Sequence, residues 1–281
     1  MIDLHTHTTY SDGTDSPLAL VKKAAASGIT LLGVTDHDST AGWAEATAAL
    51  HGDLMLALGA EVSCLTEDGI SVHMLGLLFD GENMALQQLL SDSRDTRIPR
   101  MKKMIENLQA AGYEITLEDV EAATPAGATV GRPHLADALV AKKILANRDE
   151  AFMGLLNNES PIYVSHFAPT PEDSIKAIRA AGGVAVIAHP FASRRGQVLN
   201  PDTFASLVEA GLNGIEVFHR DQSAEERNQL IAIAESLNLV ITGASDYHGT
   251  GKMNLIGENT TSQAEWERLE SMADQRRVVS R

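Results

Sequence analysis

The first 36 residues, MIDLHTHTTYSDGTDSPLALVKKAAASGITLLGVTD, decide the fold class because they predict a strand, a helix and a second strand in that order. Residues 2–7 are expected to form a short strand. Ser16 and Pro17 then supply an N-cap and a proline at the first helical position, and Gly28 is expected to end the helix. Residues 29–36 are apolar and β-branched, which is typical of a buried parallel strand.

The same alternation continues along the chain and predicts an α/β fold. A helix is expected over residues 40–50, followed by strands over 53–63 and 71–79. After residue 165 we expect a helix from Thr170, strands over 183–190, 214–219 and 239–249, and a helix over 262–275. Strands that alternate with helices predict a parallel sheet. About seven strands without a glycine-rich dinucleotide turn favour a barrel over an open doubly wound sheet.

Residues 82–164 interrupt this pattern with mostly helical sequence. We therefore predict an inserted helical cap over 82–164 and a barrel formed by residues 1–81 and 165–281. The cap contains the stretch RDTRIPRMKK, residues 94–103, which has five basic residues and one acid. This stretch is interpreted either as a solvated helix face or as a contact surface for an extended phosphorylated chain.

The composition limits the classes of partner. The chain has 22 Lys and Arg against 38 Asp and Glu, a net charge of −16, which disfavours stable binding of long nucleic acid. A small phosphorylated substrate is still allowed, because bound divalent cations reverse the charge locally. Cys64 is the single cysteine, which excludes an intrachain disulfide and a thiolate zinc knuckle. Without an apolar run of about 20 residues or a signal peptide, we expect a soluble, cytoplasmic protein and no membrane partner. The oligomeric state is left open.

Metal-ligating residue types gather where the predicted strands end. The set comprises His5, His7, Asp12, His37, Glu61, His73, His189, His219, Asp246 and His248. The carboxyl ends of strands are where α/β barrels build their active sites. Imidazole and carboxylate ligands without sulfur suit Mn²⁺, Zn²⁺ or Fe²⁺, and Mn²⁺ is our first expectation. The set offers more ligands than one ion can bind, so two or three divalent ions are expected, with Glu61 as a bridging carboxylate.

The chain contains the motifs HTH, TDHD, GAEVS, AHP and SDYH, together with a histidine on the strand after GAEVS. In these motifs the chain resembles the PHP family, which is named after polymerase and histidinol phosphatase. That family belongs to the amidohydrolase-like metalloenzymes. The resemblance implies a distorted (β/α)7 TIM-like barrel with a trinuclear metal centre. It implies three metal positions: the first held by His5, His7, Glu61 and Asp246, the second by Glu61, His73 and His189, and the third by Asp12, His37 and His248.

The insertion, with Gly131–His134, resembles one branch of this family. Members of that branch remove the 3′-phosphate of 3′,5′-bisphosphonucleosides, and related members are 5′→3′ exoribonucleases. The expected function is hydrolysis of a substrate such as pAp to AMP and phosphate. The alternative is a 5′→3′ exonuclease on short RNA or DNA. A histidinol phosphatase and a catalytically silent metal-binding barrel are further alternatives.

Other residues are predicted to act on the substrate. A hydroxide that bridges the first two metals is expected to attack phosphorus in line. Arg132 and His134 are candidates for substrate binding and catalysis, with a helix N-terminus as their structural interpretation. His219 is expected to bind phosphate or protonate the leaving oxygen, or else to belong to the core. Of Arg194 and Arg195, at least one is expected to reach a phosphate, with Arg194 the first candidate. Asp36 is expected to orient His37 or to cap its loop.

Overall fold

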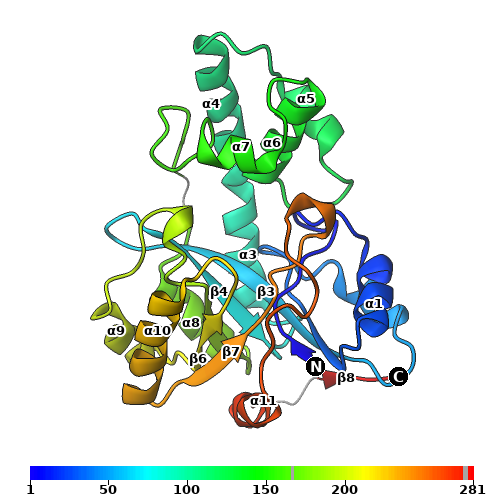
Figure 1. Cartoon of the computed structure of the whole chain (residues 1–281), viewed down its shortest axis with the longest axis vertical. Coiled ribbons are helices and arrows are strands. Elements are labelled where there is room, and N and C mark those ends of the chain that lie inside the picture. Colours follow the sequence, from blue (N-terminus) through cyan, green and yellow to red (C-terminus); the bar gives the residue numbers. More distant parts are fainter. Residues whose placement is uncertain (166–167, 275–277) are drawn as a thin grey trace.

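A computed structural model describes residues 1–165, 168–274 and 278–281, and it has a nearly closed, barrel-shaped sheet (Figure 1). Its main path runs through seven strands in chain order, and an eighth pairs with β3. The strands are β1 (Ile2–Asp3), β2 (Leu31–Val34), β3 (Met55–Leu65), β4 (Ser71–Leu77), β5 (Val184–Ala188), β6 (Gly214–Phe218), β7 (Val240–Gly243) and β8 (Val278–Val279). The α/β barrel predicted from the sequence is confirmed.

The sheet is parallel except at β4 and β8. β1, β2 and β3 are parallel, as are β5, β6 and β7, whereas β4 is antiparallel to both β3 and β5. The prediction of an all-parallel sheet is therefore wrong at β4. Only residues 66–70 separate β3 from β4, which is enough for a hairpin but too short for a crossover between parallel strands. Because β4 runs the opposite way, His73 near its start lies beside Ser63 late in β3 and Ala188 at the end of β5.

The first strand is shorter than the predicted range 2–7. After Asp3 the backbone leaves the regular ladder, because the Thr6 N–H donates to the Thr35 side chain at 3.1 Å. A further contact brings this segment to the residues that follow β7: His7 N donates to the Tyr247 carbonyl at 2.9 Å. Residues 5–7 therefore reach the far edge of the sheet, and the barrel is nearly closed.

Six helices surround the barrel: α1 (Pro17–Ala26), α2 (Trp43–Ala48), α8 (Pro171–Ala180), α9 (Thr203–Ala210), α10 (Ala224–Ser236) and α11 (Gln263–Glu270). The predicted N-cap of α1 is confirmed, since Ser16 Oγ accepts from Ala19 N at 3.2 Å. α2 and α11 are shorter than the predicted helices, and Gln275 of the latter prediction lies outside the described residues. Trp266 and Leu269 of α11 close a buried apolar cluster with side chains from β1 to β5 and β7.

The five helices α3 (Met84–Asp95), α4 (Arg97–Ala110), α5 (Leu117–Ala123), α6 (Arg132–Ala141) and α7 (Arg148–Met153) lie between β4 and β5 in the chain. Helices α4 to α7 share an apolar cluster that includes Met104, Leu108 and Leu139, and stand above one end of the barrel (Figure 1). Leu86 and Leu90 of α3 pack instead into the barrel's own core. We call residues 82–164 the cap, and its bounds stay a prediction. Among the described residues, no helix is long and apolar enough to cross a membrane.

Candidate metal centre

The nine predicted metal ligands lie together at one rim of the barrel. They form groups in which donor atoms lie within 4.8 Å of one another: His5, His7, Glu61 and Asp246; His7, Asp12, His37 and His248; and His37, Glu61 and His73. The first two groups contain every residue expected at the first and third metal positions. A further group joins His5 and His189 to Glu216. The roles of these residues stay predictions, and the geometry brings them into reach of shared ions.

Glu61 lies at the centre of the groups and is almost fully buried. Its Oε2 is 3.1 Å from His5 Nε2 and 3.0 Å from His7 Nε2. Its Oε1 is 2.7 Å from His73 Nδ1 and 3.3 Å from His189 Nε2. The two carboxylate oxygens therefore face different histidines, which is the arrangement that a carboxylate bridging two ions requires.

The group of His7, Asp12, His37 and His248 has atoms that suit a cation. Asp12 Oδ1, His37 Nδ1 and His248 Nε2 are buried and have no hydrogen-bond partner among the described residues, and Asp12 Oδ1 lies 3.1 Å from His248 Nε2. Buried polar atoms without partners are rare in proteins because each costs free energy of folding. A divalent ion bound by nitrogen and oxygen would satisfy all three. The residues present thus fit the metal ions that the resemblance implies.

Burial and neighbouring charges set the protonation of the ligands. Burial lowers the pKa of His37 to about 3 and that of His248 to about 4, so both rings are neutral at pH 7, the form that binds metals. Burial also lowers the pKa of His7, but hydrogen bonds to Asp246 and Glu61 outweigh it and raise the value to about 9. Burial raises the pKa of three carboxyl groups, but contacts with neighbouring histidines, and with Lys252 and Arg195 beside Asp246, lower it further, so all three are ionised: Asp12, Glu61 and Asp246. The rim therefore concentrates negative charge.

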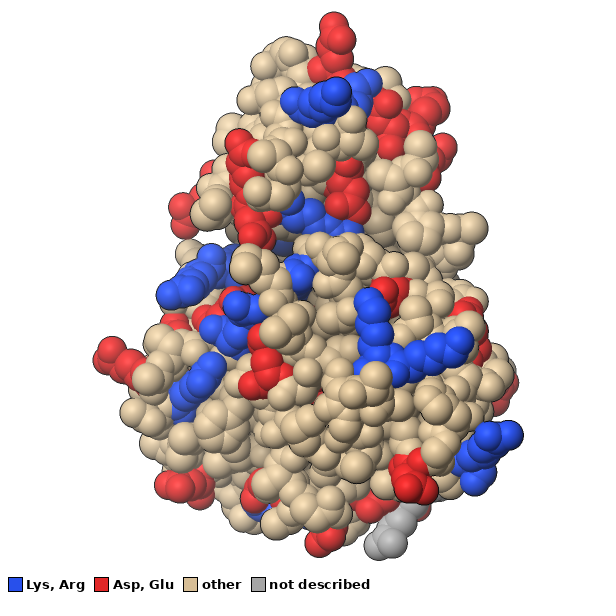
Figure 2. Space-filling view, turned by 45° about the vertical axis from the view of Figure 1, so that its right-hand side comes forward, with Lys and Arg blue, Asp and Glu red and all other residues tan. Residues whose placement is uncertain are grey.

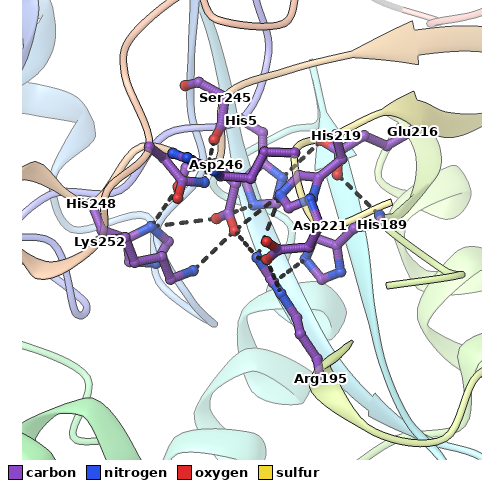
Figure 3. Close-up of polar contacts among 12 residues, drawn as sticks. His5, His189, Arg195, Glu216, His219, Asp221, Ser245, Asp246, His248 and Lys252 are labelled. Carbon is purple, nitrogen blue, oxygen red and sulfur yellow. Dashed lines mark hydrogen bonds and ion pairs between the residues drawn. The ribbon is translucent and has the colours of Figure 1, made fainter. Parts of the chain in front are cut away.

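Asp246 has two oxygens with different surroundings (Figure 3). Its Oδ1 lies 3.5 Å from His5 Nε2 and 3.4 Å from His7 Nε2. Its Oδ2 accepts from Arg195 Nη2 at 2.8 Å and Lys252 Nζ at 2.9 Å. Asp246 also has a φ of 51°, a strained left-handed backbone just beyond β7 that turns the carboxylate into the rim. One oxygen is thus free for an ion while two cations fix the other.

Glu216 on β6 was not predicted from the sequence. It is fully buried, its Oε1 is 3.0 Å from His5 Nδ1, and its Oε2 accepts the His189 N–H at 3.0 Å. A carboxylate on the far nitrogen of a ligating histidine fixes the ring orientation and leaves the other nitrogen for the metal. The available signal was a glutamate inside the apolar strand GIEVF.

Asp36 is bonded to the loop after β1, and the histidine that it supports differs from the one expected. Its carboxylate accepts from Thr8 N at 2.8 Å, from Thr8 Oγ1 at 2.7 Å and from Ser11 Oγ at 2.6 Å, and so caps the loop after β1. Ser11 Oγ in turn lies 3.2 Å from His7 Nδ1. The ligand that Asp36 helps to orient is therefore His7 rather than the neighbouring His37.

Of the two adjacent arginines after β5, Arg195 reaches the rim (Figure 3). Arg195 Nη1 lies 3.2 Å from His189 Nε2, and its Nε donates to Asp221 Oδ2 at 2.7 Å. Arg194 is exposed, so the structure does not bring the first candidate to the ligands. His219 is buried, with Nε2 3.4 Å from Asp246 Oδ2 and Nδ1 accepting from Asp221 N at 3.1 Å. Roles for Arg194 and His219 in binding stay predictions.

Arg132 and His134 begin α6 and point to different places. Arg132 donates to the Leu156 carbonyl at 2.9 Å and lies over the ring of Tyr163 at 5.2 Å. His134 is buried, its Nδ1 accepts from Gly131 N at 3.0 Å, and its ring lies close to the backbone of Ser11. His134 therefore touches the loop that carries Asp12, and their predicted roles in substrate binding stay predictions.

The interpretation of residues 94–103 as a solvated helix face is wrong for Arg97. Its guanidinium is buried, pairs with Asp38 and donates to Ser63 Oγ at 2.8 Å. Arg100 donates to the Val164 carbonyl at 2.7 Å and lies over Tyr163. Basic side chains line the hollow where the cap meets the barrel (Figure 2). Lys102 and Lys103 are the exposed basic residues of this stretch.

Comparison with known proteins identifies the family. The PHP domain model matches residues 3–151. A 3′,5′-nucleoside bisphosphate phosphatase of Chromobacterium violaceum is 33% identical, covering 89% of this chain and 88% of that protein. A phosphoribosyl 1,2-cyclic phosphate 1,2-diphosphodiesterase of Eggerthella lenta is also 33% identical, covering 91% and 97%. A 5′-3′ exoribonuclease of Haemophilus influenzae is 32% identical, covering 88% and 89%.

A solved structure supports the same assignment. A chain from Bifidobacterium adolescentis, to which a metal-dependent phosphoesterase activity has been assigned, is 38% identical with a TM-score of 0.92, covering 98% of this chain and 96% of that one. The rim supplies the imidazole and carboxylate ligands that such an activity needs. This chain therefore belongs to the PHP family and is a metal-dependent phosphoesterase.

Proposed function

We propose that this protein removes the 3′-phosphate of 3′,5′-bisphosphonucleosides, converting pAp to AMP and phosphate, with Mn²⁺ as the metal. The observation that carries the proposal is a second charged region beside the metal centre, of opposite sign. We call it the arginine cluster, made of Arg97, Arg100 and Arg132. A substrate with two phosphates would place one at the metals and the other at this cluster.

The arginine cluster carries unbalanced positive charge. Arg97 pairs with Asp38, whereas Arg100 and Arg132 donate to backbone carbonyls and both lie 5.2 Å from the Tyr163 ring centroid. Burial and the charge of Arg132 lower the pKa of Arg100 to about 9. Guanidinium groups crowded in this way are stabilised by a phosphate, which accepts hydrogen bonds from several of them.

The cluster adjoins the metal centre on two sides. Arg97 contacts Ser63, which is the register partner of His73 across β3 and β4. Arg132 donates to Asn158 Oδ1, and Asn158 Nδ2 donates to the Arg195 carbonyl at 3.4 Å. The arginine cluster is thus connected at both ends to residues or loops of the rim. One small molecule can therefore contact the arginine cluster and the metal centre together.

Residues of the rim supply the remaining contacts to the transferred phosphate. Bound metal ions would lower the pKa of water and neutralise phosphoryl charge. Arg195, fixed by Asp221 and Asp246, presents its guanidinium beside His189 and is 30% exposed. His219 Nδ1 accepts a backbone N–H, so Nε2 carries the proton, which suits a hydrogen bond to a phosphate oxygen. Both predicted roles of His219, phosphate binding and protonation of the leaving oxygen, use this proton, so we propose them together.

A second candidate is a 5′→3′ exonuclease, because the arginine cluster would equally hold the 5′-phosphate of a short RNA. The Haemophilus influenzae relative carries that activity in its name. The net charge of −16 and the burial or backbone pairing of Arg97 and Arg100 disfavour a long strand. We therefore place this activity second.

The test is product analysis with the Mn²⁺-loaded protein. pAp, a short 5′-phosphorylated RNA and phosphoribosyl 1,2-cyclic phosphate are offered at equal concentration, with the Asp246→Asn variant as control. We expect AMP and phosphate from pAp at the highest kcat/KM. Faster release of mononucleotides from the RNA 5′ end would assign the exonuclease instead, and faster opening of the cyclic phosphate would overturn both.

A further inference from the structure

The cap holds the loop after β1 through two carbonyl groups. The Tyr10 carbonyl accepts from Thr129 N at 2.9 Å, and the Asp12 carbonyl accepts from Arg148 Nη1 at 3.0 Å. Both donors belong to the cap, and Asp12 is the expected ligand. The position of this ligand's backbone is thus set from outside the barrel.

Of these cap residues, Arg148 has the side chain whose orientation is held most firmly. Its Nε donates to Asp137 Oδ1 at 2.6 Å, and its Nη2 donates to the other oxygen of the same carboxylate. Its side chain is only 10% exposed. This bidentate pair between α6 and α7 holds the guanidinium in one orientation, so Nη1 is aimed at the Asp12 carbonyl.

Arg148 also touches the second loop of the same metal position. A Cβ placed on Gly251 would lie 2.2 Å from Arg148 Nη1, so the turn η2 (Gly249–Gly251) passes directly against the guanidinium. That turn follows His248, and it is bonded to the first loop: Thr250 N donates to Thr14 Oγ1 at 2.8 Å. Arg148 therefore lies between the loop of Asp12 and the loop of His248.

We propose that Arg148 is a positioning residue for the third metal position, formed by Asp12, His37 and His248. Among the described residues Asp12 Oδ1 has no hydrogen-bond partner and lies 3.1 Å from His248 Nε2, so the backbone that Arg148 holds contributes to its placement. Outer contacts of this kind set metal affinity by about 10–100-fold. The first position contacts different elements, and its ligands have Glu216 and Lys252 as their outer partners. Arg148 thus contacts the loops of the third position, whereas the outer partners of the first position are Glu216 and Lys252.

The test counts ions and does not depend on the substrate. Metal-free wild-type protein and Arg148→Ala are titrated with Mn²⁺ by calorimetry, and bound metal is counted after gel filtration. We expect three equivalents in the wild type. In Arg148→Ala we expect two at unchanged affinity and a third weakened about 10–100-fold. If Arg148→Ala binds three Mn²⁺ ions with the affinities of the wild type, the proposal is wrong. If the wild type itself binds only two Mn²⁺ ions per molecule, there is no third ion to position and the proposal is also wrong.

Gly251→Ala provides a test that keeps the arginine. Gly251 does not have a positive φ, so alanine is allowed by the backbone and acts only by displacing the guanidinium. We expect it to weaken the third ion in the wild-type background and to add nothing to Arg148→Ala. Additive effects of the two changes would show that Gly251 acts by another route and would overturn the proposal.

A matched control lies in the same cap. Lys142 pairs with Asp119 at 3.0 Å and has no contact with residues 10–12 among those described. Lys142→Ala, like Arg148→Ala, removes a positively charged residue of the cap and its ion pair. It should leave all three Mn²⁺ affinities unchanged. An equal loss of the third ion in Lys142→Ala would mean that general loosening of the cap, and not Arg148, is responsible.

Discussion

The metal centre and the arginine cluster are neighbouring buried regions with opposite charge. In the metal centre, buried carboxylates face imidazoles, and Glu61 alone is approached by histidines from four other segments. In the arginine cluster, Arg100 and Arg132 are bonded to carbonyl groups and an amide, and among the described residues only Arg97 has a carboxylate partner. The first region has the donor atoms of a cation site, and the second has the positive charge that we propose for a phosphate.

This difference shows why the net charge of −16 does not exclude a small phosphorylated substrate. Charge that decides binding is local, because buried charges are screened much less than those on the surface. The two regions are joined by a short path through Asp38, Ser63 and the β3–β4 edge. Metal ions and a two-phosphate substrate together would neutralise both regions, whereas either alone would neutralise one.

The largest effect is expected from Asp246→Asn. The change removes an anionic ligand and weakens the hold on Arg195 and Lys252, so both the metal site and its cations are disturbed. We expect kcat on pAp to fall by at least about 10³-fold and the Mn²⁺ content to drop. A variant that keeps a tenth of the wild-type rate would break the assignment of this region as the reaction centre.

Arg97→Met should act on stability rather than on metal content. It leaves Asp38 buried without its cation, which costs about 3–5 kcal/mol of the free energy of unfolding. Urea denaturation of the metal-loaded protein measures the loss. Replacing both partners, in Arg97→Met/Asp38→Asn, should recover part of it, because no unpaired charge then remains. No recovery in the double variant would mean that Arg97 contributes through its other contacts.

Arg132→Met tests whether the cluster binds the second phosphate. Loss of charged hydrogen bonds to a phosphate should lower kcat/KM for pAp by about 10–100-fold, mostly through KM. Hydrolysis of 3′-AMP, which lacks the 5′-phosphate, should be unaffected. Steady-state kinetics on the two substrates give the comparison, and an equal loss on both would remove the cluster from substrate recognition.

The smallest effect is expected from reversing the exposed charges in Lys102→Glu/Lys103→Glu. Lys103 pairs at 2.8 Å with Glu106, which is itself exposed, and pairs of this kind contribute little to stability. Hydrolysis of pAp should be unchanged. A selective loss of activity on the 5′-phosphorylated RNA would instead favour the exonuclease and extend the anion-binding surface beyond the cluster.

Much of the fold and the rim could be predicted because ligands recur at the ends of strands. His5, His7, Asp246 and His248 lie in segments whose apolar runs mark them as strands. The direction of β4 was missed although the five residues from 66 to 70 are enough only for a hairpin. The length of this connection indicates an antiparallel pair of strands, whereas the alternation of strands and helices indicates a parallel pair.

Other parts of the site could not be predicted from local sequence. Arg194 and Arg195 are adjacent in the turn η1 (Ser193–Arg195), and no periodicity tells which of them points to the rim. Arg148 begins a short helix behind a normal Asn147 cap and contacts Asp12 from 136 residues away. Contacts of this kind depend on how the cap docks on the barrel, which no pattern within either segment encodes.

The chain order of the site has a consequence for synthesis. The apolar cluster of the cap comes from one continuous stretch, residues 101–162, so it can form while translation continues. His5 and Asp246 come from opposite ends of the chain and still belong to one ligand group. Two of the three expected groups therefore stay incomplete until Asp246 and His248 have left the ribosome. The ligand groups that need Asp246 and His248 are therefore completed only after every residue of the cap has been synthesised.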